Sequence, residues 1–247
     1  MTFVPRYQEA LETVVLDNIL AIIKRDFKAA LDLFYPLTAA GTPRLDASIS
    51  RPVGTSVLHM DGFTVKPADG DLFTIAGDTQ VYKVESATTL VGTDSDVTFA
   101  PGLKVAIPAV DGNEVVTFSG LPDLTRTLGD FANFRGSLPA LAIEPNSGGG
   151  EEGDHFENLS LKVNLYMAVE DADPTDCLRK LLKYVRTLRA VLKSAPISDY
   201  TSGISPNYVF GMIPELSWQY FIMGKDAESG TWGRNVKVEL TLKYMEG

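Results

Sequence analysis

The chain has 247 residues, of which 45% are hydrophobic and 22% charged, a composition typical of a globular protein with room for one large or two small domains. Its formal net charge is −10, which argues against a dedicated nucleic-acid-binding protein because an acidic surface repels phosphate. A single cysteine excludes an internal disulfide and any zinc site that needs two cysteines. No segment predicts a membrane span or a secretory leader, so we expect a cytosolic protein.

Residues 6–35 predict a long first helix. Apolar side chains recur there at helical spacing, and Pro5 and Pro36 bracket a run that contains neither glycine nor proline. The apolar stripe is wide, which is typical of a helix that packs across a sheet.

Residues 48–119 differ in character and predict a compact all-β domain, either a small sandwich or a small barrel. Short segments rich in β-branched residues alternate apolar and polar positions, and turn-forming pairs separate them. These pairs are Asp61-Gly62, Asp69-Gly70, Gly77-Asp78 and Asp111-Gly112.

The part that follows mixes strands with a second helix. Residues 121–128 predict a short helix or turn, 138–143 a strand, and the Gly/Glu/Ser-rich stretch 144–154 a mobile loop. Residues 156–170 form the clearest strand, because apolar residues alternate along it. These residues are Leu159, Leu161, Val163, Leu165, Met167 and Val169.

Residues 174–193 predict the second helix. Asp173 suits its N-cap, Pro174 its first turn, and the Asp176 carboxylate favours the positive end of the helix dipole. A leucine-rich stripe follows, formed by Leu178, Leu181, Leu182, Val185, Leu188 and Leu192. The segments 215–223 and 235–245 then predict an antiparallel strand pair.

This order predicts an α+β fold in which an antiparallel or mixed sheet is flanked by two helices and carries an inserted all-β domain. Residues 1–47 and 120–247 are expected to form the α+β domain, and residues 48–119 the insert.

The residues that could carry chemistry do not form a recognisable catalytic or metal-binding motif. His59 and His155 have no serine or cysteine partner at a suggestive spacing. An EF-hand that began at Asp171 would need glycine at its sixth position and glutamate at its twelfth, where the sequence has Asp176 and Leu182. Neither phosphate-binding glycine motifs nor a nucleophile elbow occur. We therefore expect a non-enzymatic protein without a cofactor.

One face of the second helix is strongly basic, against the overall acidic charge. The residues are Arg179, Lys180, Lys183, Arg186, Arg189 and Lys193. Three interpretations stay open: a solvated face whose cations favour the helix C-terminus, a docking surface for an acidic partner such as a neighbouring copy, or a DNA contact.

The order of elements outside the insert resembles phage tail terminator proteins. The leading helix, the strand Leu138-Pro139-Ala140-Leu141-Ala142-Ile143, the acidic loop, the long strand 159–169 and the helix that begins Asp173-Pro174 carry this resemblance. The insert resembles a small β module found in phage virion proteins, including neck and connector proteins. The segments that resemble it are 70–77, 81–84, 97–103 and 115–118.

The resemblance implies a virion protein that is assembled in the host cytoplasm and forms a ring, usually of six copies, at the head-proximal end of the tail. Such a ring ends polymerisation of the tail tube protein and joins the tail to the head-side connector or stopper, with the tail sheath as a further candidate partner. Membranes and sequence-specific nucleic acid are not expected partners. The residues expected to contact other subunits are Glu144, Asn146, Glu151, Glu152, Asp154, Arg179, Lys183, Arg186 and Arg189.

Two alternatives remain at this point. The chain could be another neck component, such as a stopper or an adaptor. It could also be a partner- or carbohydrate-binding β module on an α+β scaffold, a different class of protein that would not need to form a ring.

Overall fold

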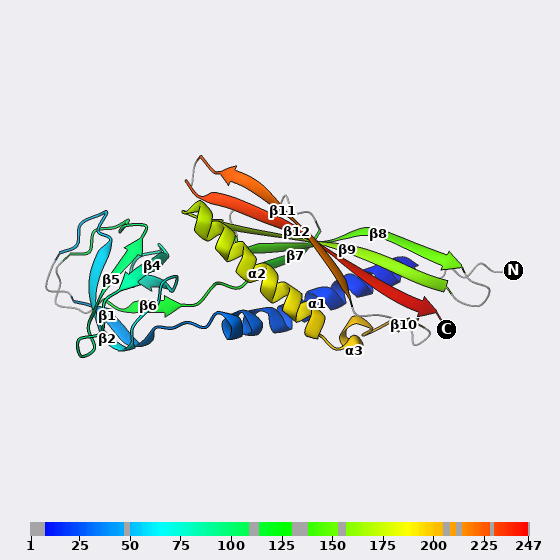
Figure 1. The fold of residues 1–247 in the computed structure, drawn as a ribbon, viewed down its shortest axis with the longest axis horizontal. Helices are drawn as coiled ribbons and strands as arrows, with labels where there is room; N and C mark the ends of the chain where they lie inside the picture. The colour runs from blue at the N-terminus through cyan, green and yellow to red at the C-terminus, as the bar shows by residue number, and fades with distance from the viewer. Residues whose placement is uncertain are drawn as a thin grey trace. The chain divides into compact units, whose positions relative to one another are not determined.

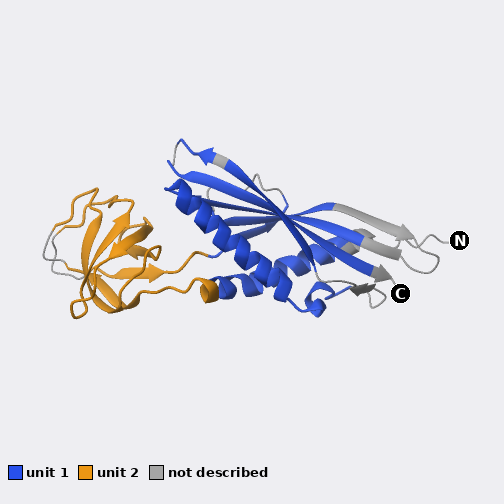
Figure 2. Ribbon diagram, in the orientation of Figure 1, with its two compact units in different colours: residues 1–31, 123–247 blue, residues 32–122 orange. Residues whose placement is uncertain are grey.

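The computed structural model describes residues 8–46, 50–108, 114–129, 138–152, 157–204, 208–210, 214–227 and 230–246. The fold is of the mixed α+β class, and sheet predominates (Figure 1). The chain divides into two compact units (Figure 2): unit 1 comprises residues 1–31 and 123–247, and unit 2 comprises residues 32–122. The predicted insert began at residue 48, whereas residues 32–47 belong to unit 2 because they supply a strand of its sheet.

Unit 2 is a single antiparallel sheet of six strands in the order β1-β2-β5-β4-β3-β6. The strands are β1 (Ala40–Leu45), β2 (Val57–Val65), β3 (Leu72–Ile75), β4 (Tyr82–Ala87), β5 (Ser95–Ala100) and β6 (Val116–Ser119). The first and last strands approach each other, since the Leu45 N–H donates to the Glu114 carbonyl over 3.0 Å. The sheet is therefore barrel-like and nearly closed, around a core of apolar side chains that alternate along its strands.

A buried carboxylate holds the segment that enters unit 2 from the first helix. Asp71 is 8% exposed and accepts backbone N–H groups of Thr38, Ala39 and Ala68 at 3.4, 3.1 and 3.1 Å. These bonds compensate the desolvation of the carboxylate. They also explain why residues 38 and 39 belong with the β unit.

Unit 1 is built on a second sheet, in the order β10-β12-β9-β8-β7, with β11 also paired to β12. Among the described strand pairs of this sheet, only β7–β8 is parallel. The strands are β7 (Thr125–Leu128), β8 (Ala140–Glu152), β9 (Glu157–Asp171), β10 (Tyr208–Phe210), β11 (Glu215–Lys225) and β12 (Trp232–Glu246). The strands predicted at 138–143 and 156–170 and the final antiparallel pair are confirmed.

Two local predictions in unit 1 are wrong. Residues 125–128 form strand β7 instead of a helix or turn, because β8 offers them a parallel partner. Residues 144–152 are not a loop, because they extend β8 and pair with β9 from Glu144↔Asn164 to Glu152↔Glu157. Glycine has no intrinsic preference for a strand, and the hydrogen-bonding partner β9 decides the conformation here.

Three helices lie wholly or mainly in the described part of unit 1. They are α1 (Gln8–Phe34), α2 (Pro174–Ser194) and the short α3 (Ile197–Tyr200). Helix α2 packs against β9 and β12, and Figure 1 shows it running across the strands. The first helix contacts the second through Phe27 and Tyr184, whose rings stack 5.8 Å apart. Asn18 of α1 also donates to the carbonyls of Tyr200 and Ser202, over 3.2 and 2.9 Å.

The predicted start of α2 is confirmed in detail. The Asp173 carboxylate accepts the backbone N–H groups of Thr175 and Asp176 over 2.7 and 3.0 Å, and Pro174 occupies the first turn. These bonds satisfy two of the four N–H groups that a helix N-terminus leaves unpaired.

The strand register divides the side chains of the sheet of unit 1 between two faces. Leu161, Leu165 and Val169 of β9 lie on the face that packs against α2, which we call the core face, and they are at most 6% exposed. The alternate positions, such as Lys162, Asn164 and Tyr166, lie on the opposite, outer face. Side chains alternate between the two faces along a strand, and paired residues share a face. Each remaining residue of the sheet can therefore be assigned to a face from its pairing partner.

Candidate interaction surfaces

His59 and the aspartates at the start of α2 have structural partners. His59 Nδ1 lies 2.8 Å from the Asp96 carboxylate. Asp173 caps α2, and Lys180 Nζ lies 3.9 Å from Asp171. His155 lies outside the described residues. Within the described ranges, no cluster of three His, Cys, Asp or Glu residues could hold a metal ion, and no helix has the length and apolar character needed to span a bilayer.

The predicted contact residues Glu144, Asn146, Glu151 and Glu152 lie on strand β8. By its pairing with Asn164, Glu144 falls on the outer face, and the Asn146 amide donates to the Glu239 carboxylate over 3.1 Å. Glu151 and Glu152 are the last residues of the strand. Asp154 lies outside the described residues. Stretch 144–152 contains three glutamates and no lysine or arginine, so this edge of the sheet is acidic.

The other predicted contact residues lie on α2 and differ in their surroundings. Arg179 is 72% exposed, with a guanidinium nitrogen 3.4 Å from Asp176. Arg186 is exposed and Lys183 half-buried. Arg189 is half-buried, and its guanidinium carbon lies 3.9 Å from the centroid of the Trp218 ring in β11. The buried Nε of Arg189 has no acceptor, so the stacked ring is its main compensation.

These two groups form separate surfaces within one copy. Glu144 and Asn146 are associated with the outer face, whereas α2 covers the core face. The structure therefore does not join the acidic and basic residues into one site. If they meet, they do so between molecules.

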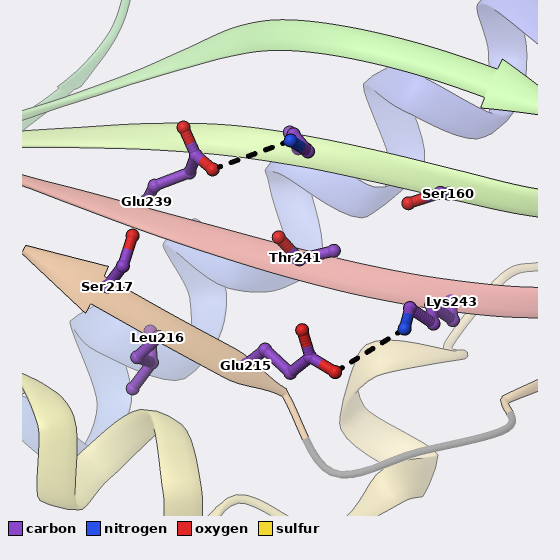
Figure 3. A pocket seen from close by; sticks show the side chains of 8 residues that line it. Ser160, Glu215, Leu216, Ser217, Glu239, Thr241 and Lys243 are labelled. Atoms are coloured by element: carbon purple, nitrogen blue, oxygen red, sulfur yellow. Dashed lines mark hydrogen bonds and ion pairs between the residues drawn. The ribbon is translucent and has the colours of Figure 1, made fainter.

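The outer face carries a polar pocket of about 420 Å³, shown in Figure 3. It is lined by Ser160, Lys162, Glu215, Leu216, Ser217, Glu239, Thr241 and Lys243. Lysine and glutamate lie across neighbouring strands, with Lys243 3.4 Å from Glu215 and Lys162 3.8 Å from Glu239. Charges of both signs neutralise each other here, and such solvated pairs are each worth about 0–1 kcal/mol. The pocket is therefore a charged but balanced surface.

Strand β11 presents an exposed apolar surface that the sequence pattern did not predict. Trp218, Tyr220 and Ile222 are 41%, 42% and 74% exposed, and their pairing with Val238, Val236 and Arg234 places them on the core face. Helix α2 reaches this surface through Arg189 but leaves each of the three side chains at least 41% exposed.

The flank of α2 that faces β11 adds a further apolar side chain. Leu182, expected in the buried stripe, is 44% exposed. It lies seven residues before Arg189, which puts both on the same side of the helix, toward Trp218. We call Leu182, Trp218, Tyr220 and Ile222 the α2–β11 patch; Arg186 and Arg189 form its basic rim.

A signal for this patch was present in the sequence. Tyr220, Phe221 and Ile222 are three consecutive apolar residues in a strand, and alternation alone would bury only every second one. Phe221, on the opposite face, is 40% exposed. The sequence could not show that β11 is an edge strand, beyond the strands β9 and β12 on which α2 packs.

Unit 2 has its own candidate pocket, of about 370 Å³, at the seam between β1 and β6. It is lined by Leu37, Ala39, Ala40, Gly41, Thr42, Pro43, Arg44, Val115, Val116, Thr117 and Phe118. The pocket lies where the barrel-like sheet is only partly closed, next to the isolated bridge between Arg44 and Val115.

No protein-family model matches the chain, and no curated protein matches its sequence. The α2–β11 patch, the acidic β8 edge and the two pockets are therefore the observations from which a function can be inferred.

Proposed function

We propose that the chain is a structural subunit of a phage particle, a tail terminator that assembles as a ring, of six copies in the simplest case, at the head-proximal end of the tail. In this proposal unit 1 is a sheet flanked by α1 and α2, and it forms the ring. Unit 2 is an inserted small β barrel that contacts a further virion component. The ring ends growth of the tube and joins the tail to the head-side connector.

The α2–β11 patch is the observation that carries the proposal. An edge strand with exposed Trp218, Tyr220 and Ile222 is an aggregation hazard for a monomer in solution, and soluble proteins usually cover or charge such edges. A subunit that is destined for an assembly has a use for it, because the patch becomes buried when the assembly forms. The order of elements that resembles tail terminators supports the particular assembly.

The structural roles of the polar clusters support a non-enzymatic protein. Asp173 caps a helix, Asp71 anchors a segment and Glu239 accepts a bond from Asn146 within an ion-paired surface. Each of these carboxylates has a use in the fold that requires no catalytic role.

Immunogold electron microscopy of phage particles that carry the chain tests the proposal. On whole particles, the label is expected at the junction between head and tail. On purified tails without heads, it is expected to remain at the end of the tube. In particles made without the chain, tails of uncontrolled length unjoined to heads are expected. A label on the head alone would favour a stopper or an adaptor, and particles without label would contradict a virion role.

A further inference from the structure

Both edges of the sheet in unit 1 are open over long stretches of the described chain. At one edge, β11 pairs with β12 alone. At the other edge, β7 covers only Ala140 to Ile143 of β8, so residues 144–152 have a partner on one side, in β9. Open strands expose rows of N–H and C=O groups that can pair with another strand. The sheet can therefore be extended at two different places.

The open β8 edge is acidic, and the helix next to the other edge is basic. Helix α2, next to β11, has six basic residues and one acidic residue, a net charge of +5 in a chain of net charge −10, which leaves −15 for the remainder. The open part of β8 contributes Glu144, Glu151 and Glu152 without a basic residue. An acidic strand next to β11 would be attracted by the net positive charge of α2 as a whole, although Glu144 lies on the outer face of its sheet and α2 covers the core face.

The middle of the open β8 edge suits a close approach to an apolar surface. Residues 148–150 are three glycines, and their backbone can lie directly against large side chains because no Cβ intervenes. Trp218, Tyr220 and Ile222 are the large side chains exposed on the other edge. Strand addition of this kind combines backbone hydrogen bonds with contacts to alternate side chains.

We propose that the occupant of the α2–β11 patch is a second copy of this chain, whose β8 edge (residues 144–152) pairs with β11 so that the sheet continues from one subunit to the next. The contact is heterologous, since each copy offers β11 on one side and β8 on the other, and such contacts close into rings or extend as filaments. The inference rests on the self-assembly in the proposed function and names the strands that would perform it. It holds whether or not the assembly caps a tail.

Sedimentation velocity of the full chain over a range of concentrations tests the contact. Wild type is expected to associate, and less strongly at high salt because basic α2 and the acidic β8 edge attract each other. A patch variant, Tyr220→Ala with Ile222→Ala, and an edge variant, Glu151→Arg with Glu152→Arg, should each weaken association about tenfold or more. The matched control is Val53→Ala with Val91→Ala, two valines of unit 2 that are 63% and 78% exposed; it should associate as wild type does.

Mixing the two variants separates this contact from a symmetric one. The intact β8 edge of the patch variant can bind the intact patch of the edge variant, while the reverse contact is defective on both sides. The mixture should therefore form dimers and nothing larger. Far-UV circular dichroism checks that both variants remain folded.

Three results would overturn the inference: a wild-type chain that stays monomeric at every concentration, variants that associate like wild type, or a mixture that forms no dimers. Immunogold electron microscopy tests the proposed function separately. A label at the tail end together with insensitive variants would retain the tail terminator and reject this contact. Sensitive variants without any label on tails would retain the contact and reject the tail terminator.

Discussion

Arg189 of α2 stacks on Trp218 of β11, with its guanidinium carbon 3.9 Å from the ring centroid. Both elements also contact β12, since α2 packs on β9 and β12 and β11 pairs with β12, and the stacked pair adds a direct contact between them. Since the Nε of Arg189 is buried without an acceptor, the ring face is what stabilises this cation.

We predict a coupling free energy of about 1 kcal/mol between these two side chains in a double-mutant cycle of Arg189→Leu and Trp218→Leu. Urea unfolding followed by far-UV circular dichroism measures it. The matched cycle is Asp176→Ala with Arg179→Ala, an exposed pair 3.4 Å apart whose coupling should not exceed about 0.5 kcal/mol. Equal coupling in both cycles would show that the stacking adds nothing.

The N-cap of α2 gives a second prediction. Asp173→Ala should lower the free energy of unfolding of unit 1 by about 1 kcal/mol, because two helix N–H groups lose their acceptor. Asp173→Asn keeps an oxygen acceptor and should recover most of the loss. The emission of Trp218 and Trp232, the two tryptophans of the chain, reports the unfolding of unit 1. An alanine variant as stable as the asparagine variant would contradict the capping role.

The stability of unit 2 should depend on alkaline pH through Tyr82. Burial, and then its hydrogen bond to Asp78, raise the pKa of Tyr82 to about 12. A raised folded-state pKa means that this contribution to stability is complete below the ordinary tyrosine pKa of about 10, and is lost as pH rises toward 12. The phenolate would have to form in the core, next to a carboxylate.

Tyr82→Phe should remove this part of the alkaline decline and cost about 1 kcal/mol at neutral pH. It should also reduce the acid sensitivity of unit 2, because the Tyr82 hydroxyl is the main cause that lowers the pKa of Asp78. Because the pKa of Asp78 is lowered in the folded state, its carboxylate stabilises unit 2 at pH values above the ordinary carboxyl pKa. This contribution is lost as pH falls through the folded-state pKa of Asp78. Circular dichroism at several pH values, with wild type and variant compared, measures both effects. Parallel pH profiles for the two proteins would refute the assignment.

A side chain added at Gly62 should destabilise unit 2 through the backbone. It has a φ of +83° within β2, and an added Cβ would lie 2.5 Å from the Thr42 carbonyl oxygen of β1. Gly62→Ala should therefore destabilise unit 2 by at least about 2 kcal/mol. Gly92, with a φ of +68° and no atom near an added Cβ, is the control, and Gly92→Ala should cost only about 1 kcal/mol. Equal losses would mean that the close approach is unimportant.

The same glycine shows where local patterns misled. Asp61-Gly62 predicted a turn between two strands, but β2 runs through it, from Val57 to Val65. The pairing with β1 is irregular at this point, and a positive φ serves that irregularity as well as it would serve a turn. The Asp-Gly pair therefore indicated a residue with positive φ, but it did not show whether that residue lies in a turn or in an irregular strand.

The structure places the contact residues predicted from the sequence on two separate surfaces. The basic face of α2 lies where helical periodicity put it, because its opposite face is buried against β9 and β12. The acidic stretch was placed in a loop because its composition disfavours burial, yet it pairs with β9 along 144–152. The exposure of Tyr220 and Ile222 was not predicted, because the same residues in a central strand would be core.

By itself the sequence determined the α+β class, the long first helix, the Asp173 cap and the strands with strict alternation, since each of these depends on neighbours within a few residues. Only the tertiary structure decided that β1 belongs to unit 2, that 144–152 is a strand and that β11 lies at an edge. These outcomes depend on which distant strand supplies the hydrogen-bonding partner, and no local pattern encodes that choice. The most informative surface of the molecule, the α2–β11 patch, arises from that choice.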